Sequence, residues 1–175
     1  LFLLSSSLTG LAVLCSYDIV LADVLENFPL SRSQTFWESP FWGGLSQRAG
    51  QTLVAFQFLA ASGYVTWLGW AAFYPPTRGI LASPAARVAV VQGFLVSSFL
   101  WPFATYRYLQ EPSLSSSVVA CLPLWAASVF VLVMIGGTFE ADAHPVVLVG
   151  SLLLGMVVVL ADGAGWSAAL IYQAK

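Results

Sequence analysis

PSLSSSVVACLPLWAASVFVLVMIGGTF, residues 112–139, runs without a single charged side chain. A helix needs roughly 20 mainly apolar residues to cross the hydrocarbon core of a bilayer, at a rise of about 1.5 Å per residue. The stretch is long enough for this, and the serines at its start can cap the first turn of a helix. It therefore predicts a transmembrane helix over residues 115–138.

Similar uncharged runs lie on both sides of this stretch. Residues 49–77 and 88–106 precede it without any charge, and residues 143–161 follow it. Each run is apolar enough to favour burial in lipid. We therefore expect spanning helices near residues 1–21, 50–74, 88–109, 115–138 and 146–172.

The first of these helices leaves the number of spans open. Asp18, Asp23 and Glu26 follow one another at helical spacing near its far end. An acidic face of this kind is also found on helices that lie along a membrane surface. The chain is therefore expected to contain four to five transmembrane helices.

The composition supports the same fold class. Of 175 residues, 59% are hydrophobic and only 8% are charged, whereas a soluble domain carries about 25% charged residues. We therefore expect a single all-α domain over residues 1–175, a polytopic integral membrane bundle. The net charge of −2 and the scattered basic residues exclude nucleic acid as a partner.

The longest predicted connection covers residues 24–48. Pro29 and Pro40 interrupt regular structure there, and the segments FWESP and FWGG place Trp37 and Trp42 in a polar environment. Tryptophan side chains prefer the headgroup level of a membrane and protein interfaces. Trp37 and Trp42 are therefore predicted to contact the interface or a partner subunit.

The segment FEADAHPVV, residues 139–147, contains the single histidine of the chain. Glu140, Asp142 and His144 alternate along it, which in an extended segment would direct three possible metal ligands to one side. The same residues are also what a polar turn between two membrane helices requires, with Asp142 or His144 capping the helix that begins at Pro145. We favour the turn and expect no metal site, and keep His144 as a candidate ligand for a pigment.

Asp162 is the more unusual acid, because it lies within the last apolar run. A carboxylate at membrane depth costs several kcal/mol unless it is paired or hydrated, so such a residue is a functional candidate. Gly163, Ala164 and Gly165 follow it and are expected to end or loosen the helix. A structural acid at the membrane boundary and an ion or proton site are both open alternatives.

Gln57 and Gln92 are uncharged polar residues within predicted spans. In lipid, each must hydrogen-bond to a neighbouring helix, a water molecule or a ligand. A glutamine oxygen is also a hard ligand suited to the magnesium of a chlorophyll. Gln57, Gln92 and His144 are therefore candidate pigment ligands, and inter-helix hydrogen bonding is the alternative.

Small residues mark possible helix-packing faces. Ser151 and Gly155 are four positions apart, as are Ala161 and Gly165, and such pairs let two helices approach closely. Pro102 and Pro123 fall within predicted helices and would open space for a lipid tail or pigment.

The sequence contains no nucleotide-binding, zinc-protease, serine-hydrolase or CxxC motif. No catalytic residues are therefore assigned, and an enzyme is not expected. The favoured function is an accessory subunit of a large energy-converting membrane complex. Its expected partners are other integral membrane subunits and the lipid bilayer.

Within this class a photosystem in the thylakoid is preferred to a respiratory complex of the mitochondrial inner membrane. The aromatic content of 14% is the basis of this preference, and chlorophyll, carotenoid or structural lipid are the expected cofactors. The start LFLLSSSLTG is consistent with import into an organelle. Two alternatives remain: an ion- or proton-coupled transporter or channel using Asp162, and a membrane enzyme acting on a lipid or quinone.

Overall fold

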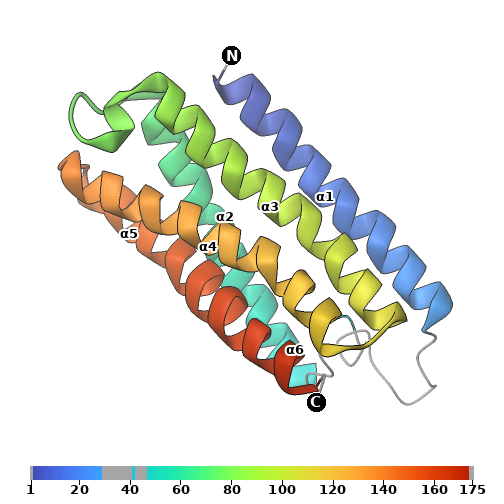
Figure 1. Cartoon of the computed structure of the whole chain (residues 1–175). Helices are drawn as coiled ribbons and strands as arrows, with labels where there is room; N and C mark the ends of the chain where they lie inside the picture. The colour runs from blue at the N-terminus through green and yellow to red at the C-terminus, as the bar shows by residue number, and fades with distance from the viewer. Residues whose placement is uncertain (1, 29–40, 42–46, 174–175) are drawn as a thin grey trace.

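The chain folds into a bundle of long helices whose axes are nearly aligned, with successive helices running in opposite directions (Figure 1). The structure, a computed structural model, describes residues 2–28, 41 and 47–173, and within these ranges it contains helices and no strand. The elements are α1 (Phe2–Asn27), α2 (Gln47–Phe73), the short 3₁₀ helix η3 (Ile80–Ala82), α3 (Pro84–Gln110), α4 (Leu114–Glu140), α5 (Pro145–Gly155), the π-helical segment η4 (Met156–Trp166) and α6 (Ser167–Gln173).

Five of the described helical rods are long and apolar enough to cross a membrane, with α5, η4 and α6 together forming the fifth. The expected all-α bundle is confirmed, and the chain belongs to the class of membrane proteins. The 26 residues of α1 make about 39 Å of helix, longer than the roughly 30 Å hydrocarbon core. The acidic residues near its end therefore do not shorten it below a full span.

α3 and α4 begin before their predicted boundaries because their first turns are capped. α3 begins at Pro84, where the Ser83 hydroxyl accepts a hydrogen bond from the Ala86 amide at 3.4 Å. α4 begins at Leu114 through a capping box in which Ser113 and Ser116 bond to each other's backbone amides. α1 and α2 likewise continue into the predicted loop 24–48, so the connection between them is shorter than expected.

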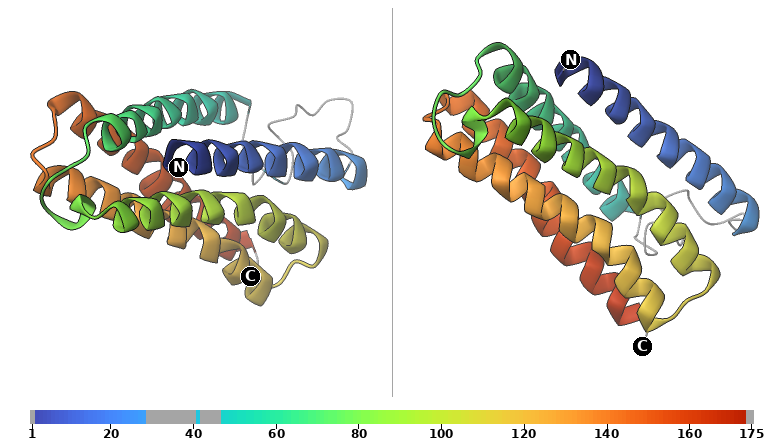
Figure 2. Two further views of the ribbon diagram at one scale, coloured as in Figure 1. Left: turned by 90° about the horizontal axis from the view of Figure 1, so that it is seen from above. Right: turned by 45° about the horizontal axis from the view of Figure 1, so that its top comes forward.

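The order of the helices around the bundle differs from their order in the chain. α4 packs against α3 on one side and against α5, η4 and α6 on the other. α1 packs against α3, and α2 packs against α5, whereas α1 and α2 scarcely touch each other. Figure 2 shows the same arrangement from two further sides. The five rods therefore form an incomplete ring with a loose seam between α1 and α2.

Close contacts fix the helix crossings at a few positions. A side chain at Gly63 of α2 would collide with the carbonyl oxygen of Gly150 of α5, so the two backbones touch there. Gly155 lies against Ile135 of α4, so the predicted Ser151 and Gly155 pair does lie on a packed face. Gly165 is exposed and contacts no other helix within 4 Å of the position of a side chain.

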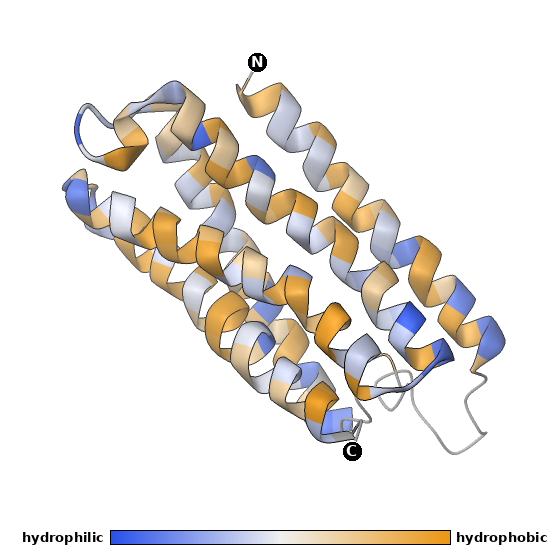
Figure 3. Cartoon of the chain, viewed as in Figure 1, coloured by the Kyte–Doolittle hydropathy of each residue, from blue (hydrophilic) through white to orange (hydrophobic). Residues whose placement is uncertain are grey.

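The outer surface of the bundle is mainly apolar. In Figure 3 the hydrophilic positions gather mainly toward the two ends of the bundle and the hydrophobic ones cover its length. Large hydrophobic side chains such as Leu14, Phe58 and Val129 are exposed on different helices. In a soluble protein this surface would be unstable, whereas lipid or an apolar protein partner solvates it.

Candidate ligand cavity

A cavity of about 760 Å³ lies inside the incomplete ring and is lined by all five rods. Most of its wall is apolar and comes from residues such as Phe94 of α3, Ala127 of α4 and Leu154 of α5. Pro123 of α4 also lines it, as expected for a proline that leaves space beside a membrane helix. Its volume is in the range of roughly 300–1,000 Å³ that is usual for small-molecule sites.

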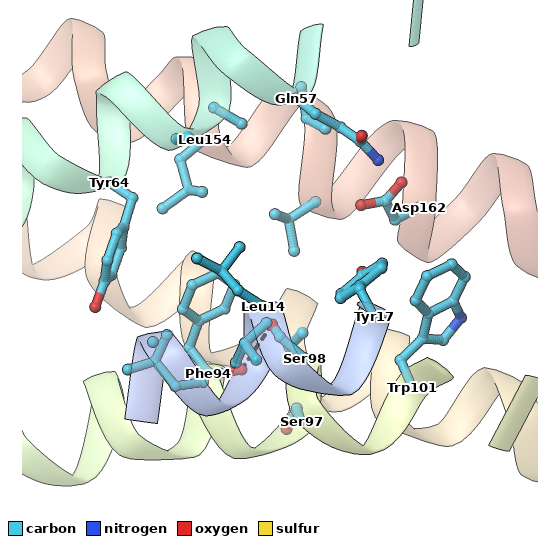
Figure 4. Close-up of a pocket in the computed structure, with 18 of the residues that line it drawn as sticks. Leu14, Tyr17, Gln57, Tyr64, Phe94, Ser97, Ser98, Trp101, Leu154 and Asp162 are labelled. Carbon is cyan, nitrogen blue, oxygen red and sulfur yellow. Dashed lines mark hydrogen bonds between the residues drawn. The ribbon is translucent and has the colours of Figure 1, made fainter. Parts of the chain in front are cut away.

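Polar and aromatic side chains converge at one end of this cavity (Figure 4). Asp162 of η4 and Gln57 of α2 point toward each other there, beside Tyr17 of α1 and Trp101 of α3. The ring centroids of Tyr17 and Trp101 lie 5.6 Å apart, and Trp166 packs edge-on against Trp101 at 6.0 Å. We call Tyr17, Gln57, Trp101 and Asp162 the polar end of the cavity.

Asp162 is the single ionisable acid on the described cavity wall, and no Lys, Arg or His side chain lines it. Within the described ranges, no residue donates a hydrogen bond to Asp162 or forms an ion pair with it. Arg107 is exposed near the end of α3 and forms no ion pair with Asp162. A partly buried carboxylate therefore faces a mainly apolar space without a hydrogen-bond or ion-pair partner among the described residues.

The π-helical segment η4 determines where Asp162 points. The sequence predicted that the helix ends or loosens after Asp162. The helix does not end there but continues through the wider turns of η4. α4 supports it, because the Ser128 hydroxyl lies 3.1 Å from the Val158 carbonyl oxygen and the Trp125 indole N–H donates to the Gly163 carbonyl oxygen at 3.2 Å. π-helical turns are rare and frequently mark functional sites.

Gly163 makes this support possible. A side chain at this position would collide with the Ser128 hydroxyl oxygen. The glycine next to Asp162 therefore serves the close approach of α4 to η4, a role that the sequence pattern did not reveal.

The cavity opens toward the outside along the seam between α1 and α2. Leu11 and Leu14 of α1 belong to its wall, yet their exposed fractions are 59% and 69%. Ala61 of α2 also lines the cavity and is exposed. Because these residues lie within the apolar spans, the opening faces the membrane rather than the water at either end.

Glu140, Asp142 and His144 are not brought together at a common point. The Glu140 carboxylate accepts a hydrogen bond from the Ile80 amide at 2.9 Å, and Asp142 forms an ion pair with Arg78. His144 is the N-cap of α5, with its Nδ1 accepting from the Val146 amide at 3.3 Å. No group of three potential ligands for a metal ion occurs in the described part of the chain.

This segment therefore has the geometry of the interhelical turn that the sequence favoured. Asp142 adopts a positive φ of 47°, which aspartate tolerates better than most residues. His144, rather than Asp142, caps the helix that begins at Pro145.

The two glutamines have different environments. Gln92 of α3 accepts a hydrogen bond from the Thr9 hydroxyl at 2.8 Å and lies 3.4 Å from the Ser5 hydroxyl, so it links α3 to α1. Gln57 lines the cavity instead. Trp37 and Trp42 lie outside the described residues.

Tyr17 and Trp101 were not recognised as site residues from the sequence. Trp101 resembles the other tryptophans near the ends of the spans, and Tyr17 precedes the acidic end of α1. Their relation to Asp162 depends on how three distant helices pack, which no local spacing reveals.

No protein-family model matches this chain, and no curated protein or solved structure is significantly similar to it.

Proposed function

We propose that this chain is a non-catalytic component of a larger membrane assembly and that its bundle holds one small lipophilic molecule. The observation that carries the proposal is the cavity of about 760 Å³, which is apolar along most of its wall and polar at one end. An elongated apolar space with a few convergent polar groups suits a molecule drawn from the membrane.

The outer surface supports membership in an assembly. Exposed large hydrophobic side chains occur on each of the five described rods, and only 8% of all residues are charged. Such a surface is equally suited to lipid and to the apolar faces of neighbouring membrane subunits. An energy-converting complex of an organelle remains the preferred setting, with a photosystem of the thylakoid ahead of a respiratory complex of the mitochondrial inner membrane.

The photosystem version requires that at least one candidate chlorophyll ligand lies on the cavity wall. Of Gln57, Gln92 and His144, Gln57 is the one on the cavity wall. Gln92 is engaged with α1, and His144 caps α5 at the surface. A chlorophyll or carotenoid inside the bundle would therefore lie against Gln57, whereas the respiratory version places an ordered lipid there.

The experiment is gentle solubilisation of the native membrane, followed by a native gel, absorption spectroscopy and mass spectrometry of the bound small molecules. We expect the chain to migrate within a large assembly and to retain one lipophilic molecule. Visible absorption would support the photosystem version, and a colourless lipid the respiratory version. A chain that migrates alone and retains no molecule would contradict the proposal.

A matched pair of variants locates the molecule. A β-carbon at Gly10 of α1 or at Gly69 of α2 would meet no atom within 4 Å, but only Gly10 lines the cavity. We expect Gly10→Phe to fill the space and abolish retention of the molecule. Gly69→Phe should leave it bound, and equal retention by both variants would remove the cavity as the site.

One observation favours a second candidate, a transporter or channel component. Asp162 faces the cavity without a partner among the described residues, as a coupling carboxylate in a membrane would. Flux of protons and ions into liposomes distinguishes the two functions. Loss of a measurable flux in Asp162→Asn would favour transport, and absence of flux in the unaltered chain would remove this candidate.

A further inference from the structure

We infer that the molecule held in the cavity is an amphipathic cation, with its positive nitrogen at Asp162 and its apolar tail along the bundle. The inference rests on the proposed function, since it assigns a chemical class to the molecule that the bundle holds. We assign a positive charge to the headgroup, a position beside Asp162 to that charge, and a route of entry to the molecule.

The charges on the cavity wall are the first argument. Asp162 supplies a carboxylate, and no basic side chain of the described wall offsets it. A phosphate or carboxylate headgroup would be repelled there, and a neutral headgroup would leave the charge of Asp162 uncompensated. A cation removes that cost, because it pairs with the carboxylate in a space of low dielectric constant.

The aromatic rings beside Asp162 are the second argument. Tyr17 and Trp101 line the same end of the cavity, with their ring centroids 5.6 Å apart (Figure 4). The faces of tyrosine and tryptophan rings attract ammonium groups, and tryptophan is the strongest of the aromatic residues in this respect. Gln57 adds a side-chain oxygen that can accept a hydrogen bond from a protonated amine.

The rest of the cavity fits a hydrocarbon chain. Along α1 its wall extends from Ser7 to Tyr17, which corresponds to about 15 Å of helix at a rise of about 1.5 Å per residue. Phe94 and Leu154 line it away from Asp162 (Figure 4). The seam between α1 and α2 lets such a chain enter sideways from the membrane, since Leu11 and Leu14 on its edge are exposed.

The test measures saturable binding to the full chain in nanodiscs, with empty nanodiscs as the background. Three radiolabelled probes share one alkyl chain and differ in headgroup charge: dodecyltrimethylammonium, dodecanol and dodecanoate. We expect the cation to bind at least about tenfold more tightly than the other two, because it alone gains both the carboxylate and the ring faces.

Two pairs of variants test whether Asp162 and Tyr17 cause the preference for the cation. Asp162→Asn should abolish it, whereas Asp18→Asn removes an equal charge from an exposed position on α1 and should preserve it. Tyr17→Leu should weaken binding of the cation, whereas Tyr17→Phe keeps a ring and should not. Both pairs are compared only in preparations with the same helical circular dichroism and the same elution volume.

The outcomes separate the inference from the proposed function. Equal binding of the three probes, or a preference for the cation that survives Asp162→Asn, overturns the inference and leaves a lipophilic ligand in the cavity. Failure of every probe to bind, together with native material that retains no molecule, overturns both.

Discussion

Gly63 is the residue at which the smallest chemical change has the largest predicted effect. A β-carbon there would overlap the carbonyl oxygen of Gly150, and this obstacle is backbone rather than a movable side chain. Gly63→Ala must therefore force α2 away from α5. Overpacking of this kind costs about 1–3 kcal/mol, which we expect to observe as a lower thermal unfolding temperature in detergent.

Gly69 provides the control for this prediction on the same helix. A β-carbon there meets no atom within 4 Å, and alanine favours a helix over glycine by about 1 kcal/mol. Gly69→Ala should leave the unfolding temperature unchanged or raise it. If Gly63→Ala were as stable as Gly69→Ala, the close crossing of α2 and α5 would be wrong.

The chemistry of single residues was partly predictable from the sequence. Pro145 was expected to start a helix and either Asp142 or His144 to cap it; Pro145 does start it and His144 is the cap. This much was predictable because capping depends only on neighbouring residues. Asp162 was singled out by the cost of a charge in lipid. The packing roles of Gly63 and Gly163 were not predicted, since the reason for each glycine lies on another helix that is distant in sequence.

At the scale of elements, the π-helical segment η4 depends on its neighbour α4. The Ser128 hydroxyl lies 2.8 Å from the Leu124 carbonyl oxygen of its own helix and 3.1 Å from the Val158 carbonyl oxygen of η4, so it links the two elements. We expect Ser128→Ala to increase hydrogen–deuterium exchange in peptides covering residues 156–166. It should also reduce retention of the molecule in the cavity, since Asp162 belongs to this segment.

Ser117→Ala is the matched variant on the same helix. Ser117 is equally buried, but its hydroxyl bonds only to the Leu114 carbonyl oxygen within α4. Exchange in residues 156–166 should then remain at the level of the unaltered chain. An identical increase in both variants would indicate a general loosening of α4 rather than support of η4 by Ser128.

The existence of the helices was predictable and their detailed form was not. Runs such as residues 112–139 lack charges, and this alone implies burial in lipid. The starts of α3 and α4 lie before the predicted ones because Ser83 and Ser113 cap their first turns. The π-helical form of η4 arises from packing against α4, which the pattern Asp-Gly-Ala-Gly does not encode.

At the scale of the whole molecule, successive connections must alternate between the two sides of the membrane. Thr77, in the connection before α3, and Ser115, in the first turn of α4, lie at opposite ends of α3. We expect Thr77→Cys and Ser115→Cys to react with a membrane-impermeant thiol reagent from opposite sides of sealed vesicles. Cys15 and Cys121 are first replaced by alanine, so that only the introduced thiol is labelled.

Labelling of both positions from the same side would contradict five spans. Labelling of each position in opened vesicles serves as the control for reactivity, because both residues are exposed. The arrangement of the rods around the cavity lay beyond prediction from the sequence, since α1 and α2 are neighbours in the chain and scarcely touch in the bundle.

That separation has a consequence for the way the protein is made. α1 precedes α2 in the chain, but the described helix against which it mainly packs is α3. Among the described helices, a newly inserted α1 therefore lacks its main packing partner until α3 has also entered the membrane. During that interval lipids or other proteins cover the face of α1 that later packs on α3. The space that becomes the cavity is therefore open to the membrane before the bundle closes around it.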